Sequence, residues 1–442
     1  MAILETPKSI LAHTKFPWVG DSTWKQVHEY SPTFFTEFLV MASQILLYKL
    51  AAHYLGKTGF SEYALARRTV SLLFPIPVLG MAVGLPRFIG FTNGRGENGR
   101  ADRYFGATLW CVAGAVFVCL LLANLFSTSF AYAFFGDKAY SYLALPISTM
   151  ILGQCLHTVV CGYFRGHVML NRANGLQVLN LAIVPVVSFL IFGQSLSKAL
   201  TAIGLISTLV AGVALLFTPV RAVAENNWKE TKELLRYGIQ RVPGDFILVA
   251  LFTLPATFVA HLKGIQEAGF VAFGVSVVSI IGAVFAPVGL VLLPKATIML
   301  AEGASEELRI HLRSMLRIAA ALSLAIVAII WISMPSLISV YLGSGFAQVA
   351  PIARILIIGA LPYSVYLVLR NVVDAYHEYG VTAAILCCGF CTFLAGSYFS
   401  NRPGLGMNAI LAAFVFAMTL IAIMSDLECR RILRVASRPP AA

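Results

Sequence analysis

Charged residues are scarce in this chain. Only 12% of its 442 residues are Asp, Glu, Lys or Arg, and the mean hydropathy is +0.82. Soluble globular proteins carry about 25% charged residues, so the composition excludes that class and predicts an all-α polytopic membrane protein. The net charge of +12 does not indicate nucleic-acid binding, because the cations lie mainly in loops between apolar runs. Residues 1–30 contain no apolar run long enough for a signal-peptide core, and we expect them to form a cytoplasmic segment.

Sequence signatures of catalysis are also lacking. There is no phosphate-binding Gly-x-x-x-x-Gly-Lys-Ser/Thr motif, no Gly-x-Ser-x-Gly elbow and no His-Glu-x-x-His. The glycine-rich run 94–99 (GRGENG) lacks the lysine–hydroxyl pair and is typical of a turn. Cys387, Cys388 and Cys391 have a ligand-like spacing but lie in an apolar run without a second pair, which favours helix packing. We therefore expect no enzyme activity, no metal and no cofactor.

Long apolar runs are what the chain does have. Runs of about 17–25 apolar residues predict membrane-spanning helices. We expect twelve, over residues 33–55, 61–88, 104–126, 142–164, 174–193, 199–220, 239–262, 269–294, 314–334, 350–373, 379–400 and 406–427. With the N-terminus inside, 23 Lys and Arg residues fall on the cytoplasmic side and five outside. This asymmetry predicts that both termini are cytoplasmic.

The chain reads as two related halves. Gly59-Phe60 recurs as Gly269-Phe270, and Pro86-Arg87 recurs as Pro294-Lys295, at offsets of 210 and 208 residues. An even number of spans in each half makes the repeats parallel, which predicts two lobes around a central cavity. We therefore expect a cytoplasmic segment, a first lobe, a linker, a second lobe and a basic cytoplasmic tail, over residues 1–30, 31–220, 221–236, 237–428 and 429–442.

Arginine and lysine at membrane depth are the informative residues. Arg67 and Arg68 lie side by side in the second predicted span, where a single charge costs roughly 3 kcal/mol. Neighbouring residues point about 100° apart on a helix, so both are not expected to anchor at the lipid surface. We predict that at least one faces a cavity and binds an anion. Lys49 either joins this site or extends to the nearby interface, and Arg354 either contacts ligand or anchors at the outer interface.

Five further positions follow the repeat or lie near the membrane. Arg165 and Arg370 occupy matching places at the inner ends of their spans, where they either contact an anionic headgroup or serve only as positive-inside charges. Glu37 matches Asp245 in the second half. These two acids either pair with Lys49 or Arg241 or take part in ion coupling, and Asp374 is a further candidate for coupling.

Several stretches are similar to known transporters. The sequence resembles the Wzx-type polysaccharide flippases of the multidrug/oligosaccharidyl-lipid/polysaccharide exporter superfamily. The resemblance rests on the 6+6 duplication and on three stretches, FSEYALARRTVSLLFPIPVLGMAVGLPRF, GYFRGHVMLNRANGLQVLN and RYGIQRVPGDF. It implies a cationic central cavity, alternating access and ion coupling. It also implies a bacterial inner-membrane location.

The resemblance leads to a specific expectation about function. The substrate would be an undecaprenyl-pyrophosphate-linked oligosaccharide, moved to the outer leaflet for O-antigen, capsule or exopolysaccharide synthesis. The partners would be this lipid-linked substrate, membrane lipid and polysaccharide polymerase or export machinery. The alternative is a cation-coupled multidrug or small-molecule exporter of the same superfamily, with Glu37 and Asp245 as its acids. A membrane enzyme is disfavoured because no predicted outside loop exceeds about sixteen residues.

Overall fold

The described part of the chain is entirely helical. The computed structural model describes residues 21–219, 227–377 and 380–436, and no strand occurs among them. Eleven helical segments in this part are long and apolar enough to cross a membrane. The first of them, Ser31–Val78, contains two passes, which brings the number to the predicted twelve.

A single glycine makes the first membrane turn. Helix α1 (Asp21–Leu73) has non-helical torsion angles at Gly56, where φ is 64° and ψ is −164°. The rings of Tyr48 and Tyr63 lie 5.6 Å apart across this turn. Fifteen residues of continuous helix would separate them by about 22 Å. The chain therefore reverses at Gly56, between the first and second predicted spans.

The first lobe contains six spans. After the turn, the second span continues from α1 through two shorter helices. The remaining elements of the lobe are α2 (Pro75–Val78), α3 (Met81–Gly94), α4 (Asn98–Leu125), α5 (Ser127–Phe135), η2 (Lys138–Leu143), α6 (Ala144–Gly166), α7 (Leu170–Val178), the π-helix η3 (Leu179–Ile183), α8 (Val184–Phe192) and α9 (Leu196–Leu215).

The second lobe also contains six spans. Its elements are α10 (Trp228–Lys263), α11 (Ile265–Ala283), α12 (Ala286–Ala301), α13 (Ser305–Tyr341), η5 (Ser344–Phe346), α14 (Val349–Ile357), α15 (Ala360–Tyr376), α16 (Val381–Tyr398), η6 (Phe399–Asn401) and α17 (Gly406–Ala436). Helix α10 begins inside the predicted linker, and α17 continues eight residues into the predicted tail. Residues 220–226 and 437–442 of those two segments lie outside the described residues.

The second and eighth spans break at matching places. In the first lobe, Pro75 and Pro77 separate α1 from α3, and the chain passes through left-handed torsion angles at Leu79 and Gly80. In the second lobe, α11 ends and α12 begins around Val284 and Phe285. Proline removes a backbone donor and clashes with the preceding turn, so such breaks are expected. The repeat predicted from sequence is therefore visible in the backbone.

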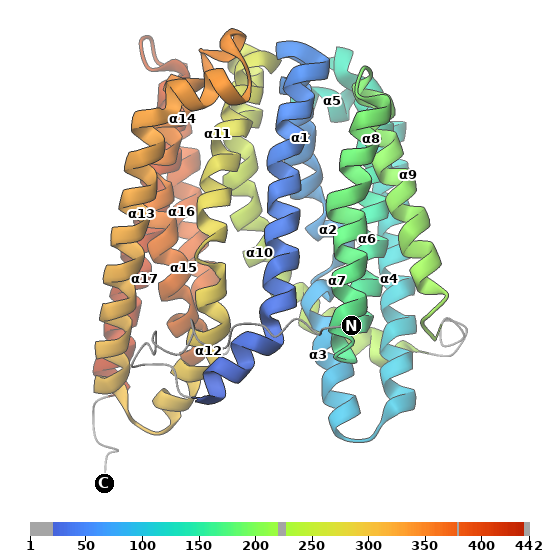
Figure 1. Ribbon diagram of the computed structural model, residues 1–442, viewed down its shortest axis with the longest axis vertical. Helices are drawn as coiled ribbons and strands as arrows, with labels where there is room; N and C mark the ends of the chain where they lie inside the picture. Colours follow the sequence, from blue (N-terminus) through green and yellow to red (C-terminus); the bar gives the residue numbers. More distant parts are fainter. Residues whose placement is uncertain (1–20, 220–226, 378–379, 437–442) are drawn as a thin grey trace, which may run out of the picture.

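The two lobes meet closely at one end and separate at the other. Figure 1 shows α1 beside α11, while α12 and α13 diverge from α3 and α4 toward the predicted cytoplasmic side. Near the predicted outer ends, Ser61 and Gly269 form the crossing of the second and eighth spans. A Cβ atom on Gly269 would lie 2.2 Å from the Cα atom of Ser61, and Ser61 donates a hydrogen bond to the carbonyl of Gln266. Only glycine permits this approach.

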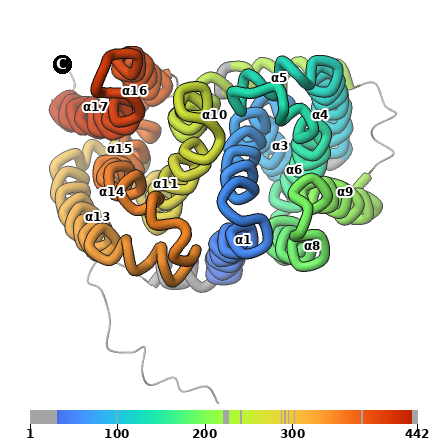
Figure 2. Tube along the Cα trace, turned by 90° about the horizontal axis from the view of Figure 1, so that it is seen from above, coloured from blue at the N-terminus to red at the C-terminus, as the bar shows by residue number. Residues whose placement is uncertain are grey.

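Helix α10 runs along the seam between the lobes. It contacts α11, α16 and α17 of its own lobe and α2, α3, α4 and α5 of the first lobe (Figure 2). A Cβ atom on Gly238 would lie 1.9 Å from the carbonyl oxygen of Leu79. At its first turns, Glu233 accepts a hydrogen bond from Arg100 at 3.1 Å, and Glu230 lies 3.2 Å from Arg103. These contacts fix the start of α10 to the first lobe.

Candidate functional site

Arg68 lies where the two lobes meet. Its Nη2 atom is 2.8 Å from the Ser276 Oγ and 3.4 Å from the Ser279 Oγ, both on α11. The hydroxyl of Tyr48 also hydrogen-bonds to the Ser276 Oγ, at 2.7 Å. The Thr253 hydroxyl of α10 donates to the backbone carbonyl of Arg68. The guanidinium group from the first lobe is therefore held by hydroxyl groups of the second.

Arg67 points in a different direction from Arg68. Its guanidinium carbon lies 5.1 Å from the ring centre of Tyr48 and 5.8 Å from that of Tyr63. Its side chain also lines a cavity of about 130 Å³ inside the first lobe. Neighbouring residues on a helix point about 100° apart, and the two arginines face different surroundings here. One contacts the lobe interface, and the other faces the interior of the first lobe.

Within the described part of the chain, the positive charge of this pair lacks a carboxylate partner. None of the ion pairs formed among the described residues involves Arg67 or Arg68. The Arg67 Nη1 and the Arg68 Nε are buried and donate no hydrogen bond to any described residue. Burying an ion costs several kcal/mol, whereas a desolvated cation–π contact contributes about 2 kcal/mol. The region therefore favours negative charge and disfavours a second cation.

Arg165 and Glu37 pair with each other. The Arg165 Nη2 lies 3.9 Å from the Glu37 Oε1, and Gln177 bridges them with hydrogen bonds of 2.7 and 2.8 Å. The predicted pairing of Glu37 with Lys49 is wrong, because twelve residues of helix α1 separate the two positions by about 18 Å. Lys49 is exposed on α1 instead. Both partners of the observed pair are about half exposed, at 43% and 57%.

The second lobe has a corresponding cluster around Arg370. Its Nε lies 3.3 Å from the Asp374 Oδ2, and Thr382 donates to the other carboxylate oxygen at 2.6 Å. Asp245 is close enough to act on the charge of Arg370. The side chain of Arg241, the other predicted partner of Asp245, lies outside the described residues. The repeat thus places an arginine and an acid from matching spans near each other in both lobes.

Arg354 belongs to a different environment. Its Nε donates to the carbonyl of Trp331 at 2.9 Å, and its guanidinium stacks 4.7 Å from the Trp331 ring. Both contacts attach α14 to α13. The structure therefore brings Arg67 and Arg68 together with Tyr48, but it directs Arg354 toward the neighbouring helix of its own lobe.

Uncharged polar residues complete the site and were not predicted. Ser276 and Ser279 hold Arg68, while Gln44, Gln154, His157 and Asn180 line the first-lobe cavity beside Arg67. Gln154 and His157 are three residues apart on α6, which places them on one helical face. This polar pair within an apolar span is the feature of the sequence that could have indicated a polar cavity.

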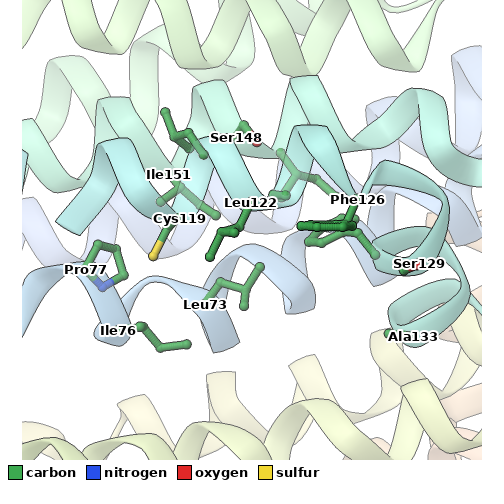
Figure 3. A pocket seen from close by; sticks show the side chains of 14 residues that line it. Leu73, Ile76, Pro77, Cys119, Leu122, Phe126, Ser129, Ala133, Ser148 and Ile151 are labelled. Atoms are coloured by element: carbon green, nitrogen blue, oxygen red, sulfur yellow. The ribbon is translucent and has the colours of Figure 1, made fainter. Parts of the chain in front are cut away.

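A second cavity in the first lobe is apolar. It measures about 430 Å³ and lies between the end of α1, α2, α4, α5 and α6. Figure 3 shows Leu73, Pro77, Cys119, Leu122 and Phe126 around it. No charged side chain lines it. Its chemistry suits hydrocarbon rather than a phosphate or a sugar.

Comparisons with known proteins agree on the architecture. A family model described as MatE matches residues 32–169. The chain is similar to an inward-facing multidrug resistance MATE family transporter of the MOP superfamily, with a TM-score of 0.77, 15% identity, and coverage of 90% of this chain and 96% of that one. The chain has the MATE fold. An outward-facing multidrug resistance MATE transporter gives a TM-score of 0.62 at 14% identity, covering 92% of this chain and 96% of that one.

A third similar structure is described by the polarity of its binding pocket. It is a MOP superfamily transporter from Pyrococcus furiosus, described as having a binding pocket of reverse polarity that suggests a different function. Its TM-score is 0.67 at 16% identity, with coverage of 93% of this chain and 96% of that one. No curated protein matches the chain. At these identities the likeness defines the fold, and the predicted Wzx-type function stays a prediction.

Proposed function

We propose that this chain is a membrane transporter that moves its substrate by alternating access between the two lobes. The greater similarity to the inward-facing structure than to the outward-facing one supports an arrangement open toward the predicted cytoplasmic side. The contact between Ser61 and Gly269 supports closure at the opposite side. In alternating access, the two lobes separate first on one side of the membrane and then on the other.

The substrate that fits the lobe interface carries negative charge. The observation behind this is Arg68, whose guanidinium lies between the lobes on Ser276 and Ser279 without a carboxylate partner among the described residues. A cationic drug would meet repulsion there, whereas a phosphate or carboxylate would receive charge-assisted hydrogen bonds. Arg165 and Arg370 lie near the predicted cytoplasmic ends of their spans, where they would meet an anion first.

Two substrate classes remain. The unpaired arginines and the apolar cavity of about 430 Å³ favour an amphiphilic anion, of which an undecaprenyl-pyrophosphate-linked oligosaccharide in a bacterial inner membrane is our first candidate. The second candidate is multidrug-type export, and the comparisons support it better, since two of the similar structures are multidrug resistance transporters. Glu37 and Asp245 lie near arginines, which makes them weak ligands for a cationic drug.

A deletion strain separates these candidates. The first predicts loss of surface polysaccharide, and the second predicts increased susceptibility in a drug panel. Wild-type chain should restore the lost trait, and Arg68→Gln should reduce the restored rate about 10- to 150-fold, the equivalent of a charge-assisted contact of about 1.5–3 kcal/mol. Arg309→Gln is the matched control, because the Arg309 side chain is 43% exposed and its ion pair among the described residues is a local one with Glu306 at 3.0 Å. Equal complementation by Arg68→Gln and wild type would contradict the proposed anionic substrate.

A further inference from the structure

The first lobe contains a polar cavity that is separate from the contact between the lobes. Five spans surround it, and its volume is about 130 Å³. Arg67 is its charged side chain, and Gln44, Gln154, His157 and Asn180 supply polar groups from three other spans. The part of the chain that lines it includes no carboxylate. A buried cation therefore borders a space without an anionic side chain.

The polar groups around the cavity are held in place. Asn180 donates to the carbonyl of Ser207 at 3.2 Å and lies 3.4 Å from the His157 Nδ1. Gln44 donates to the carbonyl of Leu181 at 3.0 Å. Asn180 and Leu181 belong to the π-helical turn η3, where the wider turn frees a backbone carbonyl for side-chain donors. The cavity is thus lined by fixed groups around Arg67.

We propose that this cavity binds a small inorganic anion of halide size, which neutralises Arg67 inside the first lobe. Its volume corresponds to about four water molecules, so a halide fits with some of its hydration water. Gln154 also lines the cavity, and its amide N–H group is a donor of the kind that complements Arg67 around such an ion. The proposal can be tested separately from the substrate, because Arg68 is the arginine that hydrogen-bonds to the second lobe, on Ser276 and Ser279.

Thermal unfolding of the purified protein tests the proposal. Sodium chloride or bromide should raise Tm saturably over sodium gluconate at the same ionic strength, since gluconate is too large for the cavity. Arg67→Gln should abolish the halide-dependent rise. Arg68→Gln makes the same charge change at the adjacent residue and should keep the rise. An equal rise in the Arg67→Gln protein, or none in the wild type, would overturn the proposal.

A second measurement needs no variant. Diffraction data from bromide-grown crystals, collected at the bromine absorption edge, should show an anomalous peak within hydrogen-bonding distance of the Arg67 guanidinium. A cavity that contains no peak at a bromide concentration that saturates the Tm rise would also overturn the proposal. The halide response depends on Arg67, whereas the proposed substrate contact depends on Arg68. A negative result for one proposal therefore leaves the other standing.

Discussion

The crossing of Ser61 and Gly269 allows a quantitative prediction about conformation. In Gly269→Ala, the new Cβ atom would lie 2.2 Å from the Cα and Cβ atoms of Ser61, whereas ordinary contacts begin at 3.4 Å. The two spans therefore have to separate by at least 1.2 Å, the difference of these distances. Overpacking of this kind costs about 1–3 kcal/mol, which corresponds to a shift of about 5- to 150-fold between two states.

The shift has a predicted direction. Gly269 and Ser61 lie five residues from the turns at Gly264 and Gly56, at the predicted outer ends of their spans. Separating the lobes at this end relieves the clash, so Gly269→Ala should favour the state that is open outward. Stability need not fall by the full cost, because the motion that relieves the clash is the transport motion itself.

Electron–electron distance measurements between spin labels check this direction. The labels replace exposed residues in a background without the eight native cysteines. A pair at Arg95 and Glu302 reports the predicted inner ends, and a pair at Lys198 and Arg402 reports the outer ends. In Gly269→Ala the inner distance should shorten and the outer distance should lengthen.

The control for this prediction is a glycine with open space around it. Gly114→Ala adds the same methyl group on α4 with no atom within 4 Å, and it should leave both distances unchanged. Identical distance distributions in Gly269→Ala and wild type would show that the crossing does not have to open. The assignment of the closed side to Ser61 and Gly269 would then be refuted.

Three further predictions concern stability. Glu230 is 4% exposed and lies between Arg100 and Arg103, so Glu230→Gln should lower the free energy of unfolding by about 1–3 kcal/mol in denaturant titrations. The control is Glu306→Gln, whose side chain is 66% exposed, and it should change this free energy by less than about 1 kcal/mol. Gly204→Val should reduce Tm and the monodisperse fraction in gel filtration, because a Cβ atom there would lie 2.4 Å from the carbonyl carbon of Thr149; Gly212→Val on the same helix, with open space around it, should not. Glu37→Gln should change the free energy of unfolding by no more than about 1 kcal/mol, since its pair with Arg165 is long and half exposed, and a larger loss in chemical denaturation would contradict this.

The sequence predicted most of the architecture because membrane-spanning helices leave strong signals. Apolar runs and loop cations gave twelve spans, and the matching motifs at residues 59 and 269 gave the repeat. The divergence of Arg67 and Arg68 followed from helical geometry alone. These features depend on local composition or on a single helix, so they are readable without knowing which spans touch.

The partners of the site residues were not predictable in the same way. Whether Arg68 contacts Ser276 depends on the packing of the second span against the eighth, about 208 residues later. Lys49 and Arg241 are the ion-pair partners that the sequence suggests for Glu37 and Asp245, yet the partner of Glu37 is Arg165 from α6. Serine, glutamine and histidine carry no membrane cost large enough to stand out in a sequence, although they shape both the interface and the cavity.

Helix α10 also has a mechanical consequence. Its first turns are fastened to the first lobe by Glu230 and Glu233, while its later turns contact both lobes, packing on α11, α16 and α17 and reaching Arg68 through Thr253. We therefore expect a rotation of one lobe against the other to bend this helix. Pro243 lacks a backbone N–H donor and Gly244 lacks a side chain, and both lie between the first turns of α10 and Thr253. We therefore expect the stiffness of α10 near these two residues to affect how readily the two lobes rotate against each other.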